Sequence, residues 1–157
     1  MKLNTQYKAK GHRNLRIGRF AQANGIYLIT SSSWQQTKVF SQWPYAHAAI
    51  QAFTQKKVLK DTQLLCWVLM PDHVHWLIQL GQEQKLSKLV GAMKSASSRA
   101  VHKAGYKQPV WRSGYYDRAI RREEDIATAA RYIVANPLRA GLVDRVGDYP
   151  FWDAVYL

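Results

Sequence analysis

The sequence predicts an α+β domain whose elements follow the order β-α-β-β-α-β, with one additional helix near the C-terminal end. Three observations carry this prediction: segments rich in β-branched and aromatic residues, segments with apolar residues at helical spacing, and a Pro-Asp turn between two adjacent strand-like runs. Two strands joined by so short a turn run antiparallel. The order is that of the ferredoxin-like plan with an antiparallel sheet.

Each element follows from its local pattern. The predicted strands are 25–31, 63–70, 73–80 and 115–120, with a further short candidate at 110–111. The predicted helices are 44–59, 85–104 and 123–136. Pro44 opens the first helix and Gly105 ends the second. Three acidic residues at 123–125 favour the start of the third helix, which Pro137 ends. The tail after this helix is turn-like, then apolar, and is expected to pack back on the domain.

Length and composition indicate one domain over residues 1–157, with residues 1–20 as a basic N-terminal arm. The single cysteine, Cys66, cannot form an internal disulfide, and no apolar signal segment precedes it. No apolar stretch approaches the ~20 residues that span a bilayer. We therefore expect a cytoplasmic protein without a membrane partner.

The net charge of +13 is distributed unevenly, because no Asp or Glu precedes Asp61. A surface of this charge attracts a polyanion, and nucleic acid is the obvious candidate. Some of the aromatic residues could stack on unpaired bases; the candidates are Trp34, Trp43, Tyr45, Trp111, Tyr115 and Tyr116. The predicted contacts to DNA phosphates are Arg13, Arg16, Lys88, Lys94, Arg99 and Lys103.

His73 and His75 flank Val74 at the start of a predicted strand. Side chains alternate faces along a strand, so the two imidazoles project from the same face. Such a pair can bind a metal ion. The alternative is that both rings are half-buried on a sheet face and only hydrogen-bond to neighbours, which is common for an isolated His-x-His.

Tyr132 and Asn136 are four residues apart on the third predicted helix and so share one of its faces. A tyrosine hydroxyl is a poor nucleophile at neutral pH, but it can attack a phosphate whose oxygen is bound to a divalent cation. The amide oxygen of Asn136 would complete a three-ligand site with His73 and His75. The alternative is that Tyr132 packs in the core and Asn136 merely ends a helix ahead of proline.

Taken together, these segments resemble the single-tyrosine HUH transposases, and specifically the REP-associated tyrosine transposases of bacteria. The resemblance rests on WVLMPDHVH at 67–75, VW at 110–111 with YDRAIR at 116–121, and YIVANPLRAGLV at 132–143. It extends from about Gly25 to Trp152. The family's metal ligands correspond to His73 and His75, its nucleophile to Tyr132, and its third ligand to Asn136. Relatives in insertion sequences commonly carry glutamine at this last position.

The resemblance implies a single-stranded DNA endonuclease and strand transferase that acts beside DNA hairpins such as REP-like palindromes. Tyr132 would form a 5′-phosphotyrosine intermediate with the help of Mg²⁺ or Mn²⁺. The resemblance also favours a monomer over a homodimer, and a location in the bacterial cytoplasm near the nucleoid.

Two other functions are compatible with the same sequence. The first is a non-catalytic single-stranded nucleic-acid-binding protein of ferredoxin-like fold. The second is a small metal-dependent hydrolase that uses His73, His75 and a carboxylate such as Asp72 or Asp117. A metal-dependent covalent protein–DNA adduct would distinguish all three.

Overall fold

A five-stranded antiparallel sheet forms the centre of the molecule. The computed structural model describes residues 21–155, apart from the side chains of Glu123 and Glu124. The strands are β1 (Ile26–Ser32), β2 (Gln63–Met70), β3 (His73–Gln79), β4 (Tyr116–Ile120) and β5 (Trp152–Ala154). Their order across the sheet is β4-β1-β3-β2-β5. The first four confirm the predicted strands within a residue or two, and the predicted α+β class is confirmed.

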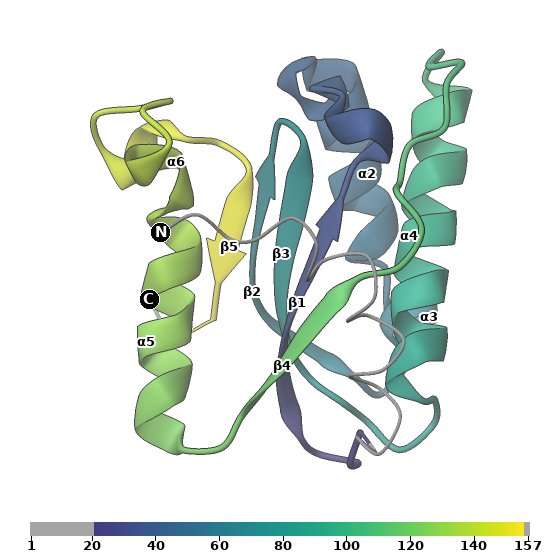
Figure 1. Ribbon diagram of the computed structural model, residues 1–157. Helices are drawn as coiled ribbons and strands as arrows, with labels where there is room; N and C mark the ends of the chain where they lie inside the picture. The colour runs from purple at the N-terminus through teal and green to yellow at the C-terminus, as the bar shows by residue number, and fades with distance from the viewer. Residues whose placement is uncertain (1–20, 156–157) are drawn as a thin grey trace.

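Helices cover both faces of this sheet (Figure 1). They are α2 (Trp43–Phe53), α3 (Lys56–Leu59), α4 (Leu86–Lys103), α5 (Glu123–Val134) and α6 (Asn136–Arg139), with short 3-10 turns at η1 (Trp34–Gln36), η2 (Val39–Ser41) and η3 (Val146–Asp148). Helices α2, α3 and α4 lie on one side of the sheet, and α5 with α6 lies on the other. The sheet is therefore buried on both faces, and each face has its own apolar core.

Alternation along the strands sends side chains to these two cores. Ile29 and Trp76 are fully buried in the core beneath α2 and α4. Val68 and Leu77 are fully buried in the core beneath α5, where they pack with Ile133. Burying one such side chain stabilises the fold by roughly 1.5–3 kcal/mol. This packing fixes which face of β3 each histidine occupies.

Two predicted helices are interrupted in the structure. The predicted helix 44–59 is two helices, because Gln55 adopts an extended conformation between α2 and α3. The predicted helix 123–136 ends at Val134, and a second short helix begins at Asn136. Pro137 lies in the first turn of this second helix, where a missing N–H is tolerated, whereas in the interior of a continuous helix its ring would clash with the preceding turn.

Two β predictions also differ from the structure. The short strand expected at 110–111 is only an isolated bridge between Trp111 and Ser33, because β1 ends at Ser32 and the chain turns into η1. The C-terminal tail packs back as expected, but it does so as an additional strand: Trp152 of β5 pairs with Val68 of β2. The β2–β3 hairpin has the predicted two-residue turn at Pro71 and Asp72.

Candidate active site

His73 and His75 project from the face of β3 that α5 covers. Their strand neighbours show this: His75 is paired with Thr30 of β1 on one side and with Val68 of β2 on the other. Val68 belongs to the core beneath α5, and directly paired residues of an antiparallel sheet share a face. Val74 points into the opposite core. The predicted side-by-side placement of the two imidazoles is confirmed.

Each imidazole has its Nδ1 atom engaged by a neighbouring oxygen. His73 Nδ1 lies 2.7 Å from Asp72 Oδ1, and His75 Nδ1 lies 2.8 Å from Thr30 Oγ1. The ring centroids are 5.0 Å apart and the ring planes are inclined at 82°. The Asp72 carboxylate can only accept, so His73 Nδ1 donates and the lone pair of this ring lies on Nε2. The Thr30 hydroxyl can either accept from His75 Nδ1 or donate to it; where it accepts, Nε2 of His75 also carries the lone pair that a metal ion binds.

The environment of His75 keeps the ring uncharged. Burial of the ring, followed by the charges of His73 and Arg139, lowers the pKa of His75 from 6.5 to about 3. A neutral imidazole is the form that binds a metal ion, since the proton and the metal compete for the same lone pair. The His75 ring is therefore uncharged, as metal binding requires, throughout the physiological pH range.

Tyr132 lies near the end of α5 with 54% of its surface exposed. The alternative in which Tyr132 packs in the core is therefore excluded. The guanidinium carbon of Arg139 lies 3.9 Å from the centroid of its ring, and Arg139 Nη2 donates a hydrogen bond of 2.7 Å to the Tyr132 carbonyl. Arg139 is also close enough to His75 to lower the pKa of that ring. Arg139 thus contacts Tyr132 directly and acts on His75 only through its charge.

Asn136 is the first residue of α6 and not the last of α5. The prediction that it shares one continuous helix with Tyr132 is therefore wrong, because α5 ends at Val134. Its Nδ2 atom is buried and has no hydrogen-bond partner among the residues that the structure describes. A buried amide without a partner is costly, and the oxygen and nitrogen of an amide can exchange places by rotation. Rotation would place Oδ1, a suitable ligand for a divalent cation, at this position.

The carboxylates of the alternative hydrolase do not join the histidines as ligands. Asp72 accepts from His73 Nδ1, on the side of the ring away from Nε2. Asp117 is paired with Ile29, whose side chain lies in the opposite core. In the described part of the chain, no group of three or more His, Cys, Asp and Glu side chains could hold a metal ion. The donor groups that the structure places together on this face are the two imidazoles.

The structure separates the predicted DNA contacts from the histidine pair. Lys88, Arg99 and Lys103 are exposed on the outer face of α4, on the other side of the sheet. Lys94 Nζ instead donates to the carbonyls of Arg112 and Gly114, at 2.7 and 2.8 Å, so its ammonium group holds a loop. The remaining two predicted contacts, Arg13 and Arg16, lie outside the described residues.

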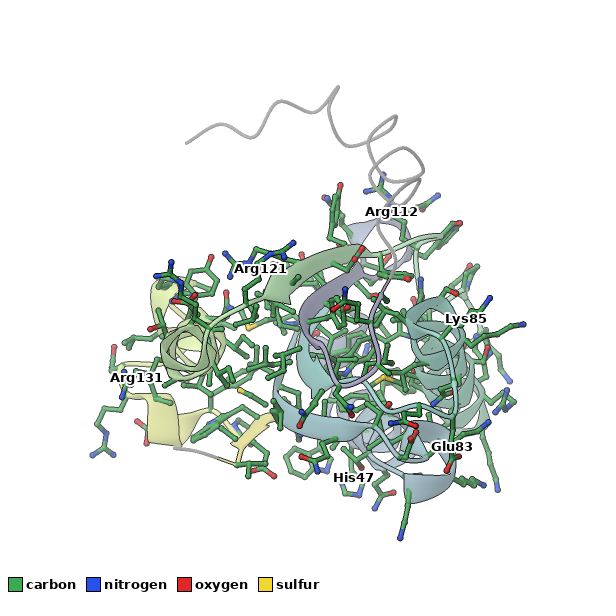
Figure 2. All side chains as sticks on the ribbon, turned by 90° about the horizontal axis from the view of Figure 1, so that it is seen from below. His47, Glu83, Lys85, Arg112, Arg121 and Arg131 are labelled. Atoms are coloured by element: carbon green, nitrogen blue, oxygen red, sulfur yellow. The ribbon has the colours of Figure 1, made fainter. Side chains whose placement is uncertain are left out.

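Two basic grooves flank the sheet. The α4 groove, about 640 Å³, contains Lys94, Arg99, His102 and Lys107 in its lining. The β4 groove, about 1060 Å³, contains Lys85, Arg118, Arg121 and Arg122 in its lining. Figure 2 shows Arg121 beside the end of β4. The sequence analysis did not single out Arg118, Arg121 and Arg122 as DNA contacts, because the charge of a side chain does not show which groove it lines.

Most of the aromatic candidates for base stacking are at least partly covered. Trp34, Tyr45, Trp111 and Tyr116 are half-buried, and Tyr115 is buried. Trp43 alone among the six is largely exposed, at 59%, with His47 stacked near it at a ring distance of 5.9 Å.

Comparison with known proteins decides the family. The family model described as "Transposase IS200 like" matches residues 22–136. The chain belongs to this transposase family. The matched range includes five candidate site residues: Thr30, His73, His75, Tyr132 and Asn136.

Relatives within the family include REP-associated tyrosine transposases. One from Escherichia coli K12 is 29% identical over 99 residues, which are 60% of this chain and 57% of that protein. A Haemophilus influenzae protein assigned to the same class is 24% identical over 138 residues, covering 81% of this chain and 78% of that protein. The chain thus spans little more than half of the E. coli transposase. The resemblance predicted from the sequence is confirmed.

Two solved structures share the fold. A REP-associated tyrosine transposase bound to a REP hairpin superimposes with a TM-score of 0.68 at 25% identity, covering 85% of this chain and 79% of that one. A protein of Deinococcus radiodurans assigned as a transposase gives a TM-score of 0.53 at 20% identity, covering 74% of this chain and 93% of that one.

No helix within residues 21–155 has the length and apolar character needed to cross a membrane.

Proposed function

We propose that this protein is a divalent-metal-dependent endonuclease and strand transferase that acts on single-stranded DNA beside a hairpin. The observation that carries the proposal is geometric: the exposed Tyr132, with Arg139 over its ring, belongs to the helix that covers the sheet face from which His73 and His75 project side by side. The relative bound to a REP hairpin supports DNA hairpins as the substrate class.

The residues present fit a divalent cation such as Mg²⁺ or Mn²⁺. His73 and His75 would hold it through Nε2, and the partnerless amide of Asn136 would supply an oxygen. Asp72 and Thr30 would orient the two rings through hydrogen bonds at Nδ1, as outer hydrogen-bond partners do in metal sites. When bound, such an ion offsets negative charge that develops on a phosphate oxygen.

Tyr132 is the proposed nucleophile. Its phenolic oxygen would form a bond to the scissile phosphorus, and the bond between phosphorus and the 3′-oxygen would break. The phenolic proton leaves to solvent and the departing oxygen takes up a proton, which gives a free 3′-hydroxyl and a 5′-phosphotyrosine. One ester replaces another, so a later 3′-hydroxyl can reverse the step and join strands without ATP.

The basic surface is the proposed site of phosphate contact. Arg118 shares a sheet face with Tyr116, two residues before it, and this is the face of the histidines. The β4 groove follows the β4 edge of the sheet, and its lining combines Arg118 of the histidine face with residues such as Lys85 beside α4. Contacts here would position the strand that leads to Tyr132, because phosphate contacts fix register without reading sequence.

A strand with a hairpin and single-stranded flanks, labelled separately at either end, tests the proposal. With Mn²⁺ present, we expect the 3′-labelled strand to move with the protein on a denaturing gel. The 5′-labelled strand should shorten and end in a 3′-hydroxyl. Chelation of the metal, Tyr132→Phe or His73→Ala should remove both products while hairpin binding persists.

Tyr116→Phe is the matched control. Tyr116 is paired with Thr30, which is paired with His75, so it lies two strands, or about 10 Å, from that histidine on the same face. This variant should form the adduct at the parental rate. An adduct that survives Tyr132→Phe and disappears in Tyr116→Phe would move the nucleophile to β4. Hairpin binding by the parent with no adduct under any metal would instead support the non-catalytic binding protein.

A further inference from the structure

Arg139 makes two different contacts with the same tyrosine. Its guanidinium lies over the Tyr132 ring, 3.9 Å from the centroid, and its Nη2 atom donates to the Tyr132 carbonyl at 2.7 Å. The two residues are on different helices, α5 and α6, joined at Ala135. The contact therefore joins the last turn of α5 to α6.

A tyrosine that is 54% exposed has little packing to select one side-chain rotamer. The guanidinium supplies that selection, because it is planar and can lie flat on an aromatic ring while its N–H groups donate in its own plane. The carbonyl it binds belongs to the last turn of α5, where carbonyl groups lack partners within the helix. One side chain thus ties the ring to its own backbone.

The position of Arg139 is itself fixed. Its backbone N–H donates to the Ala135 carbonyl at 3.0 Å, and α6 packs against β2, so the arginine is not on a free tail. Gly141, with φ of 73°, ends this segment in a conformation that suits glycine. The same guanidinium lies within electrostatic reach of His75.

We propose that Arg139 is a positioning residue that holds the Tyr132 ring in the orientation needed for attack on the phosphate. The inference rests on the proposed function for its catalytic consequence, but the contact itself is independent of it. The contact requires a planar guanidinium that carries several N–H donors. Lysine at this position would keep the charge but would not hold the Tyr132 ring in place.

The contact is tested first by NMR, without DNA or metal. Protons that lie over an aromatic ring resonate upfield, so the Arg139 side-chain protons should be shifted upfield of those of Arg131. The shift should persist in Tyr132→Phe and vanish in Tyr132→Ala. Arg131 is the matched reference because it is exposed on the same helix, one residue before Tyr132, and points away from the sheet (Figure 2). Equal shifts for the two arginines would overturn the proposal.

The second test measures single-turnover adduct formation at saturating hairpin DNA. Arg139→Lys and Arg139→Ala should each slow the reaction about 10- to 100-fold, since a misplacement of about 1 Å at a reacting group can cost about 10²-fold. Hairpin affinity and the melting temperature should stay close to the parental values. Arg131→Lys and Arg131→Ala should react at the parental rate.

The outcomes separate this inference from the function on which it rests. A parental rate in Arg139→Ala, or full recovery of the rate in Arg139→Lys, would refute a positioning role for the planar group. A parent protein that never forms an adduct would refute the proposed function, and the NMR comparison would still decide whether Arg139 fixes the ring.

Discussion

Replacing Thr30 with valine would test whether the sheet orients the metal ligands. Thr30 and His75 are direct partners across β1 and β3, and Thr30 Oγ1 lies 2.8 Å from His75 Nδ1. Valine keeps the shape and the β-branched side chain but has no oxygen. The ring then loses the hydrogen-bond partner of Nδ1, which can accept the Nδ1 proton when Nε2 binds a metal ion.

The expected loss has two parts. Removing an outer hydrogen-bond partner of a metal-binding histidine typically lowers metal affinity about 10- to 100-fold, or about 1.4 to 2.7 kcal/mol. The metal-free protein should also lose about 1–3 kcal/mol of unfolding free energy, because the Nδ1 atom of a largely buried ring is left without a hydrogen-bond partner. Asp72→Asn should act in the same direction at His73, whose Nδ1 is 2.7 Å from the carboxylate.

Calorimetric titration with Mn²⁺ measures the loss of metal affinity, and urea unfolding measures the loss of unfolding free energy. Thr37→Val is the matched control: its hydroxyl donates to the Trp34 carbonyl at 2.9 Å at an exposed position, so the variant loses one hydrogen bond away from the histidines. It should bind Mn²⁺ with parental affinity. A Thr30→Val protein that binds Mn²⁺ as tightly as Thr37→Val would refute the reasoning, and a parent that binds no Mn²⁺ would refute the metal site itself.

Three further predictions concern the rest of the molecule. Burial raises the pKa of Tyr149 to about 12, and its hydroxyl donates to the Leu69 carbonyl at 2.5 Å. Because this folded-state pKa lies above the unfolded value of about 10, stability should fall as pH rises from 10 through 12, and alkaline unfolding of Tyr149→Phe should lack this component. Burial, with a smaller effect of Asp153, raises the pKa of Cys66 to about 12, so a thiol reagent at pH 8 should label it only as the protein unfolds. If Lys88 and Lys103 both contact phosphate, replacing them with alanine should flatten the log–log salt dependence of single-strand binding by roughly 1.4, and an unchanged slope would exclude them.

The sequence alone determined the order of the first four strands along the chain and the presence of the histidine pair. Both depend on short-range regularities: alternation with a period of two puts His73 and His75 on one face, and a two-residue turn makes their strand antiparallel to the one before it. Tyr132 was also singled out from a local motif, although only the structure shows that it is exposed. These features need no knowledge of what packs against the strand.

Sequence reasoning was least accurate where one segment meets another. It extended the third helix to Asn136, whereas the structure begins a new helix there, because Pro137 fits a first turn better than a helix interior. It also gave no indication that the ammonium group of Lys94 donates to two loop carbonyls about twenty residues away. Which carbonyls a lysine can reach is decided by how helix and loop pack.

The tertiary structure alone decided how the site is oriented. Thr30 lies 45 residues from His75 in sequence and becomes its hydrogen-bond partner only through the register of β1 against β3. Arg139 on α6 contacts the ring and the carbonyl of Tyr132 on α5, a pair of contacts that the sequence did not predict. Residue types and their spacing specify which groups are available for chemistry. Their hydrogen-bond partners, and so the direction in which each group points, are set by contacts between segments that are distant along the chain.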